Sequence, residues 1–221
     1  MLTIVQFEEM LKLQSEINAT VNPDWLKAGY PYLRAALMEG AEAIEHIGWK
    51  WWKHQEKNLP ALQMEAVDIW HFYLSAKLIA SQGNIPIAAK ELKTQSESKS
   101  QSVDFDHKTY TISQLNLVEK FELLIGLAAS RRMSIPLFSA LLNETTLSWE
   151  ELYRQYTGKN TLNLFRQAHG YKEGHYQKMW GGREDNEYLV EILREIDFKE
   201  GQFKERIFAH LSEKYSQSVK K

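Results

Sequence analysis

The sequence of 221 residues contains no cysteine, only 5 prolines and only 11 glycines. The lack of cysteine excludes disulfides, zinc–thiolate sites, iron–sulfur clusters and cysteine nucleophiles together. Long hydrophobic runs are also lacking, because the longest, 123–129, is far shorter than the ~20 residues of a membrane span. Glu8 and Glu9 stand where a secretory signal would have to be uncharged. We therefore expect a cytoplasmic protein without a membrane partner.

Charge of one sign is lacking as well. Lys and Arg number 27, Asp and Glu number 29, and the formal net charge is only -2. A general nucleic-acid binder is usually more basic, so we expect no nucleic-acid partner. Hydrophobic residues make up 43% and charged residues 25%, which is typical of a globular chain. The length and the absence of a clear linker predict one domain over 1–221.

Most of the chain shows the apolar spacing of amphipathic helices, and no segment alternates as a strand would. The fold class we predict is therefore all-α. Segment 85–108 interrupts the pattern with a polar stretch, and we interpret it as a surface loop or a variable insertion. Capping boxes are expected at Thr111–Gln114 and Ser148–Glu151. The pattern predicts a first helix around residues 7–13 that ends before residue 23, and further helices at 32–47, 62–80, 114–131, 136–142, 149–169, 188–196 and 203–215.

Four carboxylates occur at helical spacing in two of these helices. Glu39 and Glu42 are three residues apart in one helix, and Glu65 and Asp68 are three apart in the next, so each pair shares a helix face. Glu65 and Asp68 stand among bulky apolar residues, and no Lys or Arg occurs between Lys57 and Lys77 to compensate them. Divalent cations such as Mg²⁺ or Mn²⁺ would compensate them, although a solvated acidic face is the alternative.

A basic face follows later in the chain. Lys159, Asn163 and Arg166 are spaced to share one side of a helix, and segment 170–186 then alternates glycines, aromatic residues and lysines. This segment matches neither the Walker loop nor the dinucleotide-binding glycine pattern. An anion site built from side chains is the interpretation we favour, and a solvated surface stripe is the alternative.

The sequence resembles the all-α dimeric dUTPases, which are relatives of the MazG-like nucleoside triphosphate pyrophosphatases. Glu39-Gly-Ala-Glu42 followed by Glu65-Ala-Val-Asp68 is similar to the metal signature of that superfamily. The more specific similarity lies in Thr157–Arg166, in His169–Gly174 and in Trp180-Gly-Gly-Arg-Glu-Asp-Asn186. Shorter similarities lie at Leu13–Asn18 and at Ile69–Phe72.

The resemblance implies a helical bundle that acts as a homodimer and hydrolyses dUTP to dUMP and pyrophosphate, and also dUDP. It implies that Glu39, Glu42, Glu65 and Asp68 hold Mg²⁺, with Mn²⁺ as an alternative. The deoxyuridine would be surrounded by Gln14, Asn18, His71 and a tryptophan of the 49–52 cluster, for which we choose Trp51. The phosphates would be held by Lys159, Asn163, Arg166, Lys172, Tyr176, Lys178 and Asn186.

The mechanism expected from these residues is attack by a metal-activated water on the phosphoanhydride. Glu39 is our choice for the carboxylate that takes the proton of the water, and Glu42 is the second catalytic residue. Attack at the α and at the β phosphorus both stay open. Two other hypotheses remain: a MazG-like pyrophosphatase for another nucleoside triphosphate, and a non-enzymatic helical protein-interaction module. His71 has the further alternative of a hydrogen-bonded core histidine.

Overall fold

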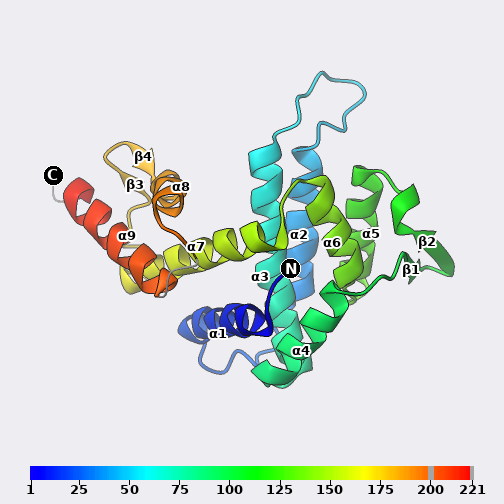
Figure 1. Cartoon of the computed structure of the whole chain (residues 1–221). Helices are drawn as coiled ribbons and strands as arrows, with labels where there is room; N and C mark the ends of the chain where they lie inside the picture. Colours follow the sequence, from blue (N-terminus) through cyan, green and yellow to red (C-terminus); the bar gives the residue numbers. More distant parts are fainter. Residues whose placement is uncertain (199–201, 220–221) are drawn as a thin grey trace.

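The computed structural model describes residues 1–198 and 202–219 and confirms the all-α class (Figure 1). Two antiparallel hairpins are its strands: β1 (Ser102–Phe105) with β2 (Lys108–Thr111), and β3 (Met179–Trp180) with β4 (Arg183–Glu184). The helices of the described residues are α1 (Ile4–Val21), α2 (Tyr32–Glu45), α3 (Leu59–Ala80), α4 (Ile85–Ser96), α5 (Leu117–Ala129), α6 (Ile135–Glu144), α7 (Trp149–Ala168), α8 (Asp185–Glu195) and α9 (Phe203–Val219).

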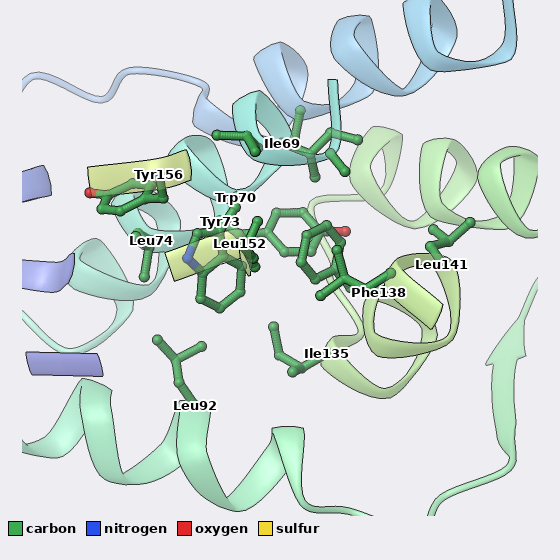
Figure 2. Packing of buried hydrophobic residues seen from close by; sticks show 14 of the residues in the cluster. Ile69, Trp70, Tyr73, Leu74, Leu92, Ile135, Phe138, Leu141, Leu152 and Tyr156 are labelled. Atoms are coloured by element: carbon green, nitrogen blue, oxygen red, sulfur yellow. The ribbon is translucent and has the colours of Figure 1, made fainter. Parts of the chain in front are cut away.

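Helix α3 is the centre of the bundle, as its nearly continuous apolar sequence predicted. It packs against α2, α1 and α7, and its Trp70 and Tyr73 are fully buried. Figure 2 shows these two rings among the core side chains, next to Phe138 of α6. The rings of Trp70 and Phe138 are stacked at 5.4 Å between centroids. This packing holds α3 firmly, so that the polar side chains it carries are presented from a rigid element.

Local capping signals set several of the helix ends. Ser148 caps α7 by accepting a hydrogen bond from the Glu151 backbone amide, but the predicted capping box is only half formed, because the Glu151 side chain binds Arg154 and Gln155 instead. Ser134 caps α6, where Pro136 occupies the first turn. Helix α2 stops before Gly48, whose φ of 80° is readily adopted by glycine alone. These ends agree with the sequence pattern to within a few residues.

The segment 85–108 is not the loop that we expected. Residues 85–96 form α4, which begins at the cap Asn84 and packs against α1 and α6. Its buried residues include Ala88, Ala89 and Leu92, which form a narrow apolar stripe, and the helix is polar from Lys90 onward except for Leu92. The remainder of the segment leads into the β1–β2 hairpin, with Ser102 opposite Thr111. That the segment varies among relatives stays a prediction.

The predicted capping box at Thr111–Gln114 is also wrong. Residues 112–114 form a short 3₁₀ turn, η1 (Ile112–Gln114), and Thr111 makes no side-chain cap. The capping box lies instead at Asn116 and Glu119, where each side chain bonds the backbone amide of the other residue. The helix therefore begins at Leu117, because Asn116 offers a stronger cap than the threonine pattern upstream.

A second, smaller core lies at the C-terminal end of the described chain. Residues of α7, α8 and α9 surround the buried Trp180 and Phe165 there. Gly158 of α7 allows α8 to approach closely, because an added Cβ would meet the Leu193 side chain at 2.7 Å. Within the described residues, no helix is both long and apolar enough to cross a membrane. This core fixes α8 beside the basic face of α7.

Candidate functional site

Three of the four carboxylates predicted from the sequence come together between α2 and α3, and the fourth, Asp68, lies near enough to act on Glu39 and Glu65 through its charge. Carboxylate oxygens of Glu39, Glu42 and Glu65 can all lie within 4.8 Å of one another. Asp68 follows Glu65 by one turn on α3, and its side chain is 25% exposed. Helices α2 and α3 pack directly against each other, which is why two pairs from different helices form one cluster.

This cluster is electrostatically strained without a cation. Partial burial and the charges of Asp68, Glu65 and Glu42 raise the pKa of Glu39 to about 7. Burial, and then Asp68, likewise raise the pKa of Glu65. Burial also raises the pKa of Asp68, although Lys159 opposes that shift. Carboxylates that converge in this way disfavour the charged form unless positive charge is supplied.

Positive charge reaches the cluster from outside α3, which our sequence reasoning did not foresee. Lys159 of α7 contacts Asp68, with 3.2 Å between Nζ and Oδ2, across 91 residues of sequence. The His46 Nε2 lies 3.3 Å from Glu65 Oε1. Lys159 compensates the cluster only in part, because the pKa of Glu39 remains raised. Oxygen ligands at this density, with uncompensated charge, fit a hard divalent cation.

A buried polar network lies further along α3. Gln14 and Asn18 of α1 are buried and bond Ser75 of α3, and His71 bonds the Gln14 side chain. Tyr156 of α7 donates toward Gln14, and its ring lies 4.4 Å from the His71 ring. The structure thus brings together three of the residues predicted to surround the nucleoside, and one of them, His71, follows Asp68 by one turn of α3.

His71 is neutral in this setting. Its burial, and then the charge of Lys159, lower its pKa to about 3. Its Nδ1 lies 3.0 Å from Gln14 Oε1, whereas its Nε2 is buried and finds no partner among the described residues. A core histidine would have both nitrogens satisfied, so the unpartnered Nε2 favours a binding role.

The basic face of α7 runs away from the carboxylates. Asn163 accepts a hydrogen bond from Arg166 Nη1 at 3.1 Å, and Arg166 also binds the buried Asp185 of α8 through Nε (2.8 Å) and Nη2 (2.7 Å). Tyr176 donates to Asp185 at 2.8 Å, and Asn186 lies 3.5 Å from Arg166 Nη2. Most of the donors of Arg166 are therefore occupied, and the pair with Asp185 cancels its charge.

The remaining residues of the set lie in loops. Lys172 donates to the Val21 carbonyl at the end of α1, and Lys178 lies over the Tyr171 ring at 5.5 Å. Trp51 is 85% exposed in the loop between α2 and α3, which Figure 1 shows extending away from α1. His71 lies twelve residues into α3, about 18 Å from the end where this loop joins. The structure therefore does not bring Trp51 to Gln14, Asn18 and His71.

Sequence reasoning missed several residues that complete this site. Ser75 and Tyr156 are ordinary helix residues in the pattern, and Asp185 was read only as part of a longer motif. An apolar hollow of about 330 Å³ beside α2 was missed too, and it is lined by Tyr30, Pro31, Tyr32, Arg34, Ala35, Met38 and Phe72. For Asp185, the signal available was an acid next to the basic face. For Ser75 there was none, because its partners are 57 and 61 residues away.

Comparison with known proteins adds to this geometry. A family model described as dUTPase matches residues 6–171, well over half of the chain. The match contains the acidic cluster, the buried network and the basic face of α7, and it ends before Lys172, Tyr176, Lys178 and Asn186. A search of curated proteins found no match. With its helical fold and its acidic cluster, the chain therefore belongs to the all-α dUTPase family and is a dUTP diphosphatase, a hydrolase.

Proposed function

We propose that the protein hydrolyses dUTP to dUMP and pyrophosphate in a Mg²⁺-dependent reaction, and that it also hydrolyses dUDP. The contact between Asp68 and Lys159 carries this proposal, because it joins the acidic cluster to the basic face of α7. A cation site and an anion site that meet at one point suit a substrate that is a metal-complexed polyphosphate.

Glu39, Glu42, Glu65 and Asp68 would hold Mg²⁺, or Mn²⁺ in its place, which would neutralise phosphate charge and lower the pKa of a bound water. Glu39 accepts the proton of the attacking water, and Glu42 is the second catalytic carboxylate. The water oxygen joins phosphorus while the α–β anhydride bond breaks, so that dUMP and pyrophosphate separate. Lys159 stands beside the reacting phosphates and stabilises the negative charge that grows on them.

The other predicted residues hold the two ends of the substrate. Gln14, Asn18 and His71 face the nucleoside, since amide groups can both donate to and accept from the edge of uracil. Trp51 would stack on the base only if the loop between α2 and α3 folds over the site. The phosphates are contacted by Lys159, Asn163, Arg166, Lys172, Tyr176, Lys178 and Asn186.

Arg166 has a more limited part in phosphate binding than its charge suggests. Of its five N–H groups, those that face Asp185 and Asn163 are engaged, so it cannot present a two-pronged fork to a phosphate while Asp185 is bound. It offers at most a remaining Nη1 donor, and it orients Asn163 and Asn186. Lys159 is then the principal cation at the reacting phosphates.

We further propose a single domain that works as a cytoplasmic homodimer. Exposed apolar side chains support a homodimer, notably Tyr30, Met38 and Trp52, which are 43%, 53% and 59% exposed. The oligomeric state can be measured by sedimentation equilibrium, and a monomer at micromolar concentration would contradict this part of the proposal.

Product release from a panel of nucleotides tests the function. Pyrophosphate is measured with dUTP, dCTP and dTTP, and inorganic phosphate with dUDP, each with Mg²⁺, with Mn²⁺ and with EDTA. We expect turnover of dUTP and dUDP that requires metal. A preference for dCTP or another triphosphate would instead support the MazG-like alternative, and no turnover of any nucleotide would support the interaction module.

A further inference from the structure

Ser75 occupies the centre of the buried network and was not among the residues predicted to bind substrate. It lies on α3, fully buried, one turn beyond His71. We propose that Ser75 is a positioning residue that fixes the orientation of the Gln14 and Asn18 amides and thereby leaves His71 Nε2 as a hydrogen-bond acceptor for the nucleoside. This inference rests on the proposed function, because that function places the three side chains against the nucleoside.

The Ser75 hydroxyl has three neighbours and one hydrogen. It donates that hydrogen to the His71 backbone carbonyl at 3.1 Å, the usual i−4 bond of a serine in a helix. Its two lone pairs then accept from Gln14 Nε2 at 2.9 Å and from Asn18 Nδ2 at 3.0 Å. Every hydrogen-bonding capacity of the hydroxyl is thus used.

The opposite orientation of the amides is unfavourable because of this serine. If both amides turned over, Ser75 would face two amide oxygens and the His71 carbonyl with a single hydrogen to give. If only Gln14 turned over, its oxygen would meet Asn18 Oδ1, which now accepts from Gln14 Nε2 at 3.1 Å. Each change buries an acceptor without a donor, which is unfavourable because the acceptor has given up its hydrogen bonds to water.

The orientation of Gln14 then determines which nitrogen of His71 carries the hydrogen. Gln14 Oε1 is an acceptor, so His71 Nδ1 must be the donor across their 3.0 Å contact. A neutral ring protonated at Nδ1 has a free lone pair at Nε2. That atom is buried and has no partner among the described residues, so its lone pair is left to accept from a ring N–H or a sugar hydroxyl when the nucleoside displaces the side chains that cover it.

The tautomer is measured directly in the wild-type protein. Two-dimensional ¹H–¹⁵N NMR on protein labelled with ¹⁵N at histidine should show His71 neutral, with Nδ1 protonated and Nε2 unprotonated, in the absence of nucleotide. A ring protonated at Nε2 would overturn the proposal without any substitution. In Ser75→Ala, the His71 signals should shift toward a mixture of the two neutral forms.

Kinetics provide the second readout. Ser75→Ala should lower kcat/KM for dUTP about tenfold, the effect of one misplaced neutral hydrogen bond, and should reduce the preference for dUTP over dCTP. Ser75→Thr, which keeps the hydroxyl, should restore the Nδ1-protonated ring and most of the preference. Ser139→Ala is the matched control, because Ser139 also donates to an i−4 carbonyl but touches no amide.

The outcomes separate this inference from the function on which it rests. Unchanged His71 signals in a folded Ser75→Ala variant would overturn the proposal, as would a loss of preference equally large in Ser139→Ala. If the His71 signals of Ser75→Ala shift but its kcat/KM is unchanged, then Ser75 does orient the amides, but His71 does not contact the nucleoside and that part of the proposal is overturned. Two dUTP analogues identify the group that donates to Nε2, because the 3′-deoxy analogue lacks the sugar hydroxyl and the N3-methyl analogue lacks the ring N–H. For the analogue that lacks the donating group, Ser75→Ala should no longer lower kcat/KM.

Discussion

The substitution Glu39→Gln tests the electrostatics of the acidic cluster. In the metal-free protein the pKa of Glu39 is about 7, above its ordinary value of 4.5, because of burial and then the charges of Asp68, Glu65 and Glu42. When the pKa of a carboxyl is higher in the folded state than in the unfolded state, ionisation favours unfolding. The contribution of Glu39 to the free energy of unfolding is therefore full at acid pH and is lost as pH rises from about 4.5 through about 7. The wild-type protein in EDTA should therefore be less stable at pH 8 than at pH 5.

The size of the effect follows from the same shift. The difference between the two pKa values corresponds to ~3 kcal/mol if fully expressed. Glu39 is only half-buried, and solvent screening reduces this to about 1–2 kcal/mol. A glutamine has the same shape without the charge. In EDTA, Glu39→Gln should therefore be about 1–2 kcal/mol more stable than wild type at pH 8, and most of that gain should be absent at pH 5, near the lower end of this pH range.

Urea denaturation followed by circular dichroism, at both pH values and with EDTA or Mg²⁺, provides the measurement. Mg²⁺ should stabilise the wild type at pH 8 and should stabilise Glu39→Gln much less, because the cation has lost one ligand. The control is Glu45→Gln on the same helix, since Lys50 and Trp49 already bind that carboxylate. An unfolding free energy in EDTA that Glu39→Gln does not raise at pH 8, or raises equally at pH 5, would refute this account of the acidic cluster.

Two further predictions concern single residues of the site. Glu42→Gln should abolish turnover with little loss of unfolding free energy, because Glu42 is exposed but belongs to the cluster; near-normal pyrophosphate release would remove it from the metal site. Asp185→Asn should destabilise the fold by about 3 kcal/mol in urea, since it leaves Arg166 buried without its counter-charge. Burial by itself would raise the pKa of Asp185, but the hydrogen bonds and the charge of Arg166 outweigh burial, and the pKa of Asp185 is lowered. The stability that this ion pair gives the wild-type protein is therefore lost as pH falls through the lowered pKa. The variant should consequently lose less stability than the wild type between pH 5 and pH 3, and an equal loss would contradict the ion-pair account.

The helices that bury a wide apolar face could be predicted well from the sequence. Helix α3 is an example, because most positions from Leu62 onward are apolar and lie on every side of the helix, and only a central helix can bury such a surface. Helix α4 was missed although Asn84 and Pro86 are start signals and Ala88, Ala89 and Leu92 have helical spacing. Two of the three residues in this apolar stripe are alanines, which give a weak hydrophobic signal, and the polar stretch that follows the helix obscured the pattern.

The sequence by itself determined which chemistry this protein can perform. Its lack of cysteine leaves oxygen and nitrogen ligands, and the spacing of Glu39 with Glu42 and of Glu65 with Asp68 places each pair on one helix face, because helical geometry is local. The family resemblance then indicated dUTP as the substrate. All of this information is contained in short stretches of chain.

Only the tertiary structure decided how those groups meet. It placed Lys159 against Asp68 across 91 residues, engaged Arg166 with the buried Asp185, and gathered Gln14 and Asn18 around Ser75. No local pattern encodes such contacts, because they depend on which helix faces are pressed together by the burial of the apolar core. The same packing leaves Trp51 exposed and away from the buried network, a separation that no spacing in the sequence reveals.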